Sequence, residues 1–320
     1  MRSVWKTFCF TVILVSLAVM TLAGCGGTGL GSDNEGNGSK VKTKDPEKVK
    51  IGVSLSTLNN PFFVSVKKGI TTLTHQKKSK VEIFDAQNDP AKQSNDVEDM
   101  IQKKVDILII NPVDSSAITP TVKDANEAGI PVICVDRSSD GGKVLTLVAS
   151  DSTKGGQMAA KYMYEKLGKD AKIAELEGIP GASATRERQK GFDGYAKGKL
   201  HLVTKQTANF DRAKGLSTAE NILQAHGDIV GIFAQNDEMA LGAVQAVKSA
   251  GKKIMIVGFD GEGDAIKAVK DGHMAATVAQ KPVDMGKLSV QAAYDYFAGK
   301  KVPAHVRSPL SLETTESLNK

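Results

Sequence analysis

The 320-residue chain has few cysteines, few aromatic residues and only a small excess of positive charge. Of its three cysteines only Cys134 lies clear of the N-terminal apolar segment, so no disulfide can form within the body of the chain. Forty-two basic and 36 acidic residues give a net charge of +6. This excess is too small for the basic surface by which proteins of this length bind nucleic acids. Five histidines are scattered without ligand spacing, so we expect neither a metal site nor a cofactor.

Composition and length favour a folded protein with two domains. Hydrophobic residues make up 41% and charged residues 24% of the chain, which is typical of globular proteins. A disordered chain, a collagen-like chain and a membrane protein with several spans are therefore excluded. Domains usually contain about 100–200 residues, so two domains are expected.

The N-terminal residues 1–24 are typical of a secretory signal peptide. Arg2 and Lys6 precede an apolar run that ends in small residues. Residues 22–25, Leu-Ala-Gly-Cys, resemble the lipobox of bacterial lipoproteins. In a lipobox the cysteine thiol, which here belongs to Cys25, is joined to diacylglycerol. The alternative is a transmembrane anchor. The segment 25–47 disfavours it, because its Gly, Ser, Asn and charged residues predict a flexible tether. We expect an extracytoplasmic protein that is anchored to the membrane by lipid.

From Val49 onward, short β-branched runs alternate with amphipathic segments. The predicted strands are 49–55, 80–86, 106–112, 130–136 and 145–150, then 172–178, 201–207, 229–235, 254–260 and 275–280. Apolar runs without polar alternation are typical of parallel strands that are covered on both faces. The sequence therefore predicts an α/β protein with doubly wound parallel sheets.

The two sets of strands repeat one another. Ile51 and Ile107 are 56 residues apart, and so are Ile173 and Ile229. Four apolar strands lead at their carboxyl ends to Asn111, Asp136, Asn236 and Asp260. Ligands of open α/β sheets bind beyond the carboxyl ends of the strands. Two similar lobes that face each other would bring these four side chains into one cleft.

The polar residues near the predicted cleft suit an uncharged polyol. They are Asn60, Asn111, Asp136, Arg137, Arg188, Asn236, Asp260 and Gln280. Two carboxylates and two guanidinium groups cancel in charge, while amides both donate and accept hydrogen bonds to hydroxyl groups. Four aromatic residues lie beside them and could pack on a sugar ring: Phe62, Phe63, Phe210 and Phe259. Taken singly, each Asn or Asp is more typical of a helix cap and each Phe of a core. The occurrence of all these residues near the ends of the predicted strands favours a sugar-binding site.

Nine segments resemble the ribose-binding members of the periplasmic binding protein family, which serve bacterial ABC importers. They are 56–69, 109–117, 130–137, 149–156, 184–192, 208–216, 233–243, 257–261 and 276–282. The resemblance implies a protein that captures D-ribose and delivers it to permease subunits. It also implies that the sugar is held by Asn60, Phe62, Phe63, Asn111, Asp136, Arg137, Arg188, Phe210, Asn236, Phe259, Asp260 and Gln280.

The resemblance further implies two lobes joined by a three-strand hinge. We expect crossings near 150–151, 280–281 and 308–310. The N-terminal lobe would then contain 48–150 and 281–309, and the C-terminal lobe 151–280 and 310–320. A sugar held by both lobes would shift the equilibrium towards the closed form, which a permease recognises. The protein is expected to be a monomer.

Several alternatives stay open at this point. The ligand could be another aldose of the allose or galactose type, or the closed form could signal to a chemoreceptor or sensor kinase. An enzyme that uses Asp136 and Asp260 as an acid and base is disfavoured, because neighbouring arginines are expected to lower the pKa of both carboxyls. Repressors of the lactose-repressor family share the two-lobe body, but a signal peptide and tether replace their helix-turn-helix here.

Overall fold

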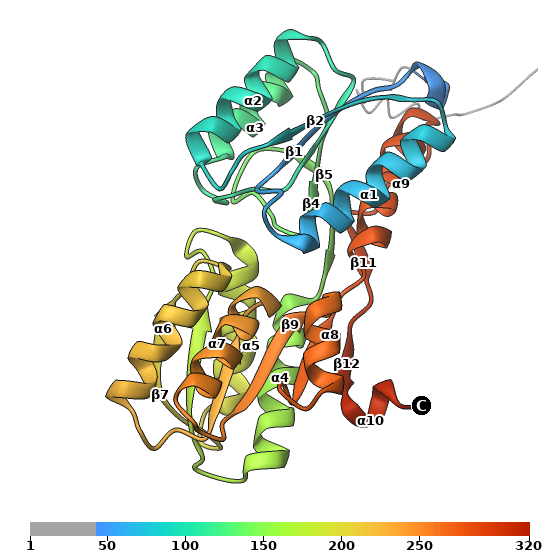
Figure 1. The fold of residues 1–320 in the computed structure, drawn as a ribbon. Coiled ribbons are helices and arrows are strands. Elements are labelled where there is room, and N and C mark those ends of the chain that lie inside the picture. Colours follow the sequence, from blue (N-terminus) through green and yellow to red (C-terminus); the bar gives the residue numbers. More distant parts are fainter. Residues whose placement is uncertain (1–42) are drawn as a thin grey trace, which may run out of the picture. The chain divides into compact units, whose positions relative to one another are not determined.

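The two predicted sets of strands form two separate six-stranded sheets in the computed structural model, which describes residues 43–320 (Figure 1). The first sheet contains β1 (Lys50–Leu55), β2 (Lys80–Asp85), β3 (Ile107–Ile110), β4 (Val132–Val135), β5 (Val144–Ser150) and β11 (His305–Ser308). Its strand order is β11-β5-β4-β3-β1-β2, and every neighbouring pair is parallel. All five predicted strands of this set are present.

Helices cover both faces of the first sheet (Figure 1). One face carries α1 (Pro61–Gln76) and α9 (Pro282–Phe297), and the other carries α2 (Pro90–Gln102) and α3 (Thr119–Glu127). In β3, Ile107 and Ile109 pack beneath α1 and α9, while Leu108 and Ile110 pack beneath α2 and α3. Because successive strand residues point to opposite faces, an all-apolar strand is what two covered faces require.

The second sheet repeats this plan. It contains β6 (Lys172–Glu177), β7 (His201–Thr207), β8 (Gly231–Ala234), β9 (Met255–Asp260), β10 (Ala276–Ala279) and β12 (Ser311–Thr314), in the order β12-β10-β9-β8-β6-β7. Its helices are α4 (Ser152–Leu167) and α5 (Ser183–Ala196) on one face, and α6 (Arg212–Ala225), α7 (Asp237–Ser249) and α8 (Gly263–Lys270) on the other. The short α10 (Thr315–Leu318) follows β12. The predicted class, two doubly wound α/β lobes, is confirmed.

Three features of the sheets could not be seen in the sequence. β12 runs antiparallel to β10, because the chain enters the second lobe there from the side on which the parallel strands end. The 56-residue spacing matches the register only once: Ile51 pairs with Ile107, whereas Ile173 pairs with Gly231, so Ile229 lies before the strand. The strands β11 and β12 were not predicted, since they are short and mix polar with apolar residues.

The chain passes between the two sheets in three places. It leaves the first sheet after Ser150, returns between β10 and α9, and crosses again between Ser308 and Ser311. The returning helix α9 packs against α1, so residues far apart in sequence complete the first lobe.

The N-terminal signal peptide, Cys25 and most of the predicted tether lie outside the described residues. Lys44, placed within the tether by sequence, instead contacts the first lobe: its N–H donates to the carbonyl of Phe297 at 3.1 Å, and its ammonium group pairs with Asp106. A 3₁₀ turn at Pro46–Lys48 then leads into β1. From residue 43 onward, no helix has both the length and the apolar character needed to cross a bilayer.

Glycines allow the helix pairs beside each sheet to approach closely. In α4 and α5, a Cβ atom on Gly156 would lie 2.1 Å from the carbonyl oxygen of Arg188, and one on Gly191 would lie 1.9 Å from that of Thr153. The same reciprocal arrangement joins α1 and α9 through Gly69 and Gly286. The close contact of α4 with α5 sets the position of the helix that carries Arg188.

We expect Gly156→Ala to destabilise the protein, since overpacking of this kind costs about 1–3 kcal/mol. Gly194→Ala in α5 is the matched control, because its Cβ would meet nothing within 4 Å. At that position alanine should stabilise by about 0.4–1 kcal/mol. Urea unfolding of both variants measures the difference. Equal unfolding midpoints would contradict the close approach of the two helices.

Candidate functional site

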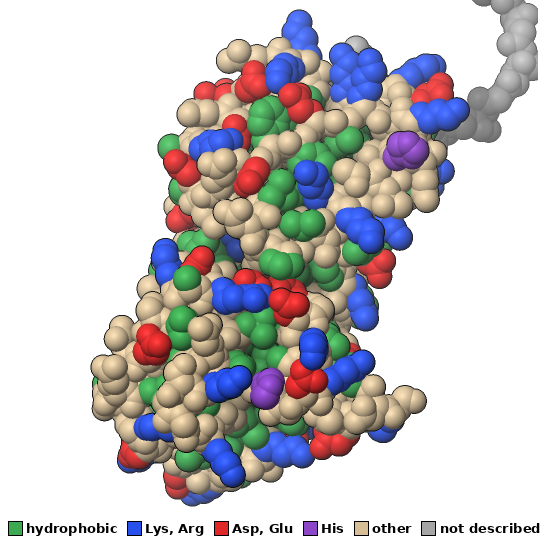
Figure 2. Space-filling model, viewed as in Figure 1, with side chains coloured by type: hydrophobic (Ala, Val, Ile, Leu, Met, Phe, Trp, Pro, Cys, Tyr) green, Lys and Arg blue, Asp and Glu red, His purple; other side chains and the backbone are tan. Residues whose placement is uncertain are grey.

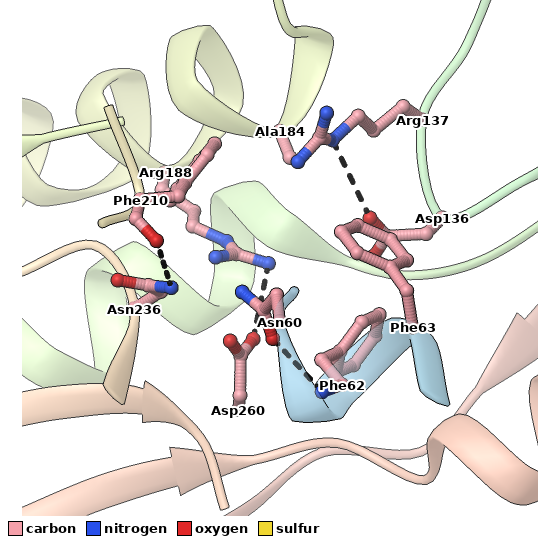
Figure 3. Close-up of a pocket in the computed structure, with 10 residues that line it drawn as sticks. All are labelled: Asn60, Phe62, Phe63, Asp136, Arg137, Ala184, Arg188, Phe210, Asn236 and Asp260. Atoms are coloured by element: carbon pink, nitrogen blue, oxygen red, sulfur yellow. Dashed lines mark hydrogen bonds and ion pairs between the residues drawn. The ribbon is translucent and has the colours of Figure 1, made fainter. Parts of the chain in front are cut away.

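The carboxyl ends of strands from both sheets lead to one cavity of about 230 Å³ (Figure 3). Ten residues line it: Asn60, Phe62, Phe63, Asp136, Arg137, Ala184, Arg188, Phe210, Asn236 and Asp260. Nine of them are among the twelve predicted from sequence, and Ala184 is the addition. Most of the lining side chains are polar or charged, which suits a polar ligand.

Helix starts position the two cavity asparagines. Asn60 caps α1, its Oδ1 accepting the N–H of Phe62 at 2.8 Å, and Pro61 occupies the first helical position. Asn236 caps α7, and its Oδ1 accepts the N–H of Met239 at 3.0 Å. Both residues are therefore caps and cavity residues at once. Because a cap uses only the carbonyl side of the amide, the NH₂ group stays available as a donor: that of Asn236 donates to the carbonyl of Phe210 at 3.3 Å and keeps a second N–H.

Three predicted residues, Asn111, Phe259 and Gln280, lie behind the cavity wall and do not line it. Asn111 is fully buried, its Oδ1 accepting the N–H of Ser56 at 3.3 Å and its Nδ2 donating to the carbonyl of Val135 at 2.9 Å. These bonds tie β1 and β4 together where both strands end. Asn111 thus supports the loop that carries Asp136.

Phe259 and Gln280 support the charged residues of the second lobe. The ring of Phe259 lies 3.8 Å from the guanidinium carbon of Arg188, in the range of a cation–π contact. Gln280 donates from Nε2 to Oδ1 of Asp260 at 2.9 Å. Each fixes the orientation of a side chain that does line the cavity.

The cavity contains two pairs of opposite charges, all of them buried (Figure 3). Asp136 lies 3.7 Å from Nε of Arg137, and Asp260 lies 3.5 Å from Nη2 of Arg188. Both distances are too long for a good hydrogen bond. The Nε atoms of Arg137 and Arg188 are buried and have no hydrogen-bond partner within residues 43–320. These donors can serve a ligand.

Burial dominates the protonation of these groups. It raises the pKa of Asp136, although Arg188 and Arg137 oppose the shift, and it raises the pKa of Asp260 to about 7. Burial also lowers the pKa of Arg137 to about 10. The neighbouring arginines act on both carboxyl pKa values in the expected downward direction, but the net shift is upward, because loss of hydration outweighs ion pairs of this length.

Aromatic rings hold the arginines of the cavity. The guanidinium carbon of Arg137 lies 5.1 Å from the ring centre of Phe63 in the first lobe and 5.2 Å from that of Phe210 in the second. Phe62 packs edge-on against Phe63, with ring centres 5.2 Å apart. The planar cation is therefore held between rings from both lobes, with its edge left for hydrogen bonds.

Three lining residues have left-handed backbone conformations: Asp136, Phe210 and Asp260, with φ values of 64°, 59° and 126°. Such values are uncommon outside glycine and cost free energy that the surrounding structure must offset. Their concentration around one cavity indicates that these backbones are held for what their side chains do there.

Asp237 holds the loop that follows Asp260, and the sequence analysis missed it. Its Oδ2 accepts the N–H groups of Gly261 and Glu262 at 2.7 and 2.8 Å, and its Oδ1 accepts the hydroxyl of Thr277 at 2.7 Å. Burial raises the pKa of this carboxyl well above its usual range. An acid beside Asn236 in a helix start resembles an ordinary first-turn residue, so only its burial reveals the role.

Gln235 and Glu175 form a second supporting pair that the sequence analysis missed. Gln235 donates from Nε2 to Glu175 at 2.8 Å, and its backbone carbonyl accepts from Nη1 of Arg188. Both side chains are fully buried, and burial raises the pKa of Glu175 to about 8. Polar residues inside otherwise apolar strands were the available signal.

The two lobes contact each other on both sides of the cavity. Ser138 donates its N–H to the hydroxyl of Ser183 at 2.9 Å, and Arg186 pairs with Asp140 at 2.8 Å. At another contact between the lobes, Phe62 donates its N–H to Oε1 of Glu262 in the second lobe at 3.0 Å. The structure therefore represents the closed arrangement of the lobes.

The described residues also form two further hollows: one shares Asn60 and Phe210 with the cavity, and the other lies between α5 and β7 near Asp193. On the face shown in Figure 2, acidic and basic side chains are interspersed over both lobes. Among residues 43–320, no group of three or more His, Cys, Asp or Glu side chains could hold a metal ion. Cys134 is a free, buried thiol.

Comparison with known proteins assigns the family. Residues 51–301 match the model of the periplasmic binding protein domain. The ribose import binding protein RbsB of Bacillus subtilis (strain 168) is 59% identical over 264 residues, 82% of this chain and 87% of that protein. RbsB of Escherichia coli (strain K12) is 46% identical over 264 residues, 82% of this chain and 89% of that protein.

A solved structure agrees with this assignment. An ABC transporter periplasmic solute binding protein from Actinobacillus succinogenes 130z with bound D-allose is 33% identical, with a TM-score of 0.79. The match covers 85% of this chain and 100% of that one. On its fold, its domain match and these relatives, the chain belongs to the periplasmic binding protein family.

Proposed function

We propose that this protein captures D-ribose between its two lobes outside the cytoplasm and delivers it to the permease of an ABC importer. The observation that supports this most directly is the cavity between the lobes, whose polar groups come from both lobes and cancel in charge. Periplasmic binding proteins bind a solute without converting it, so the chain is a carrier and not an enzyme.

The chemistry of the cavity favours a sugar over a charged or apolar ligand. Each sugar hydroxyl offers one donor and two acceptor positions. Asp136 and Asp260 can accept, Arg137 and Arg188 can donate, and the asparagines can do both. Rings such as Phe62 leave apolar walls against which the C–H faces of a pyranose can pack. The names of the RbsB relatives support ribose among the sugars.

Closure follows from the division of the site between the lobes. In this proposal the lobes, 48–150 with 281–309 and 151–280 with 310–320, move about the three connecting segments. Only a ligand with more contacts in the closed form can shift the equilibrium towards it. A sugar that binds Asp136 and Asp260 at once meets this condition. One chain supplies both sides of the site, which supports action as a monomer.

We also propose that the mature protein is held at the outer face of the membrane through lipid on Cys25. The support is the order of charged start, apolar run and Leu-Ala-Gly-Cys. Acyl chains contribute about 0.8 kcal/mol per buried CH₂, so several chains hold a soluble domain at a bilayer.

Calorimetry across a panel of sugars tests the ligand. We expect D-ribose to bind with a submicromolar to micromolar Kd, and 2-deoxyribose to bind at least about 100-fold more weakly because it leaves buried polar groups unpaired. At about 100 times its Kd, ribose should stabilise the protein by about 2.7 kcal/mol in thermal unfolding. A stronger response to allose or galactose would contradict the choice of ribose.

Substitutions in the cavity test the site. Asn236→Ala and Asp260→Ala should each weaken ribose binding by more than about tenfold. Each substitution leaves a ribose hydroxyl without its hydrogen-bond partner, and hydrogen bonds to charged groups contribute about 1.5–3 kcal/mol. Asp89→Ala is the control for the loss of a helix cap, because Asp89 caps α2 and is exposed. It should keep full affinity. Unchanged affinity in both cavity variants would mean that the site lies elsewhere.

Detergent partitioning tests the anchor. The protein expressed in bacteria should enter the detergent phase and incorporate labelled fatty acid, and Cys25→Ser should abolish both. Cys134→Ser is the matched control, since that thiol is buried in the first lobe. A Cys25→Ser protein that still carries label would refute anchoring at this residue.

A further inference from the structure

Glu262 reaches from the second lobe to the first at the edge of the cavity. It immediately precedes α8, two residues after Asp260. Its Oε1 accepts the N–H of Phe62, in the first turn of α1, at 3.0 Å. Oδ1 of Asn60 accepts the same N–H at 2.8 Å. Because the Glu262 contact joins the two lobes, opening the lobes breaks it.

The surroundings of this carboxyl are unfavourable for a negative charge. Asp260 at the end of β9, and Asp237 and Glu238 in α7, are the acidic neighbours that disfavour its ionisation. The second oxygen of Glu262, Oε2, is buried and has no hydrogen-bond partner within the described residues. An ionised carboxylate with one oxygen unpaired in a buried site costs free energy that a neutral carboxyl avoids.

The nearby cations are already engaged with other carboxylates. Arg212 of α6 binds Glu238 through Nε at 3.0 Å and Asp264 of α8 through Nη2 at 3.2 Å. Arg188 of α5 pairs with Asp260 at 3.5 Å. From α1, the N–H of Phe62 is the group that contacts Glu262. Burial first, then the acidic neighbours, raise the pKa of Glu262 to about 9 in the closed arrangement.

Opening of the lobes removes the part of the burial that comes from the first lobe. The carboxyl regains water, which lowers its pKa towards the ordinary glutamate value of about 4.3. Loss of the Phe62 N–H, which favours the charged form, and the acidic neighbours, which stay in the second lobe, oppose part of this fall. A proton is then bound more tightly by the closed form than by the open form. Closure is favoured at low pH, and the advantage is lost as the pH rises towards the closed-state value.

We propose that Glu262 takes up a proton as the two lobes close, so that sugar capture by this protein is coupled to proton uptake. The inference rests on the proposed function, because it requires a sugar that closes the lobes. Glu262 is not among the twelve residues predicted to bind the sugar, and its proposed role is in closure of the lobes.

Asp136 and Asp260 are the cavity carboxyls that could also exchange a proton on binding, because burial raises the pKa of both. Sugar hydroxyls that donate to their oxygens favour the charged form, so their contribution would be proton release. The cavity carboxyls and Glu262 therefore act in opposite directions, and a change at Glu262 alone separates them.

Calorimetric titration of D-ribose at pH 7 in phosphate and in Tris, which differ in ionisation enthalpy, counts the protons exchanged. We expect the wild type to take up less than about one proton per sugar net, because release by the cavity carboxyls offsets part of the uptake, and its Kd to rise by less than about tenfold per pH unit between pH 6 and 8. Glu262→Gln keeps an oxygen for the N–H of Phe62 but cannot ionise. Its proton uptake per sugar should be lower than that of the wild type by up to about one proton, and its Kd should not rise with pH over this range.

Asp264→Asn is the matched control. This carboxylate lies two residues further on, is largely exposed and pairs with Arg212 within the second lobe. The control should take up the same number of protons as the wild type.

The inference would be overturned if Glu262→Gln exchanged the same number of protons as the wild type and its Kd had the same pH dependence. If the glutamine variant does not fold, Glu262→Ala takes its place, since alanine cannot ionise either. If no sugar of the panel gave heat or a thermal shift, the proposed function itself would be refuted, and the inference with it.

Discussion

Two carboxylates and two guanidinium groups are removed from water between the lobes, and the rest of the structure makes this burial possible. Buried charges are costly unless opposite charges and hydrogen-bonding groups lie close to them. Asp136 with Arg137, and Asp260 with Arg188, provide only long ion pairs of 3.7 and 3.5 Å. Burial therefore still raises the pKa of both carboxyls. Groups left with spare hydrogen-bonding capacity in a small, neutral cavity favour a ligand made of hydroxyl groups.

Two layers of support hold these charges in place. Aromatic rings contact the guanidinium groups, so that only their edges point into the cavity. Behind them, Asn111, Asp237 and Gln235 tie strand ends and loops together through buried hydrogen bonds. Close packing of α4 with α5 through glycines sets the helix that carries Arg188. The precision of the site comes from this second layer, and the left-handed backbone at Asp260 is held by the same layer.

Most of the fold could be predicted because its signals are local. Apolar strands such as Ile107–Ile110 require two covered faces, and the structure covers both with helices. The strands β11 and β12 were missed, because they mix polar with apolar residues and lack the continuous apolar run of the other strands. The equal spacing of Ile51–Ile107 and Ile173–Ile229 marks the repeat but not the pairing, since Ile173 pairs with Gly231.

For the site, the sequence by itself determined which chemical groups stand at the ends of the strands, because a parallel strand delivers its last residue to a common edge. Only the tertiary structure decided which of them face the cavity. Asn111, Phe259 and Gln280 lie one layer behind it, and no local pattern separates a lining residue from a supporting one. The tertiary structure also decided the protonation of the carboxyls, since the loss of water around each group depends on how closely two distant lobes meet.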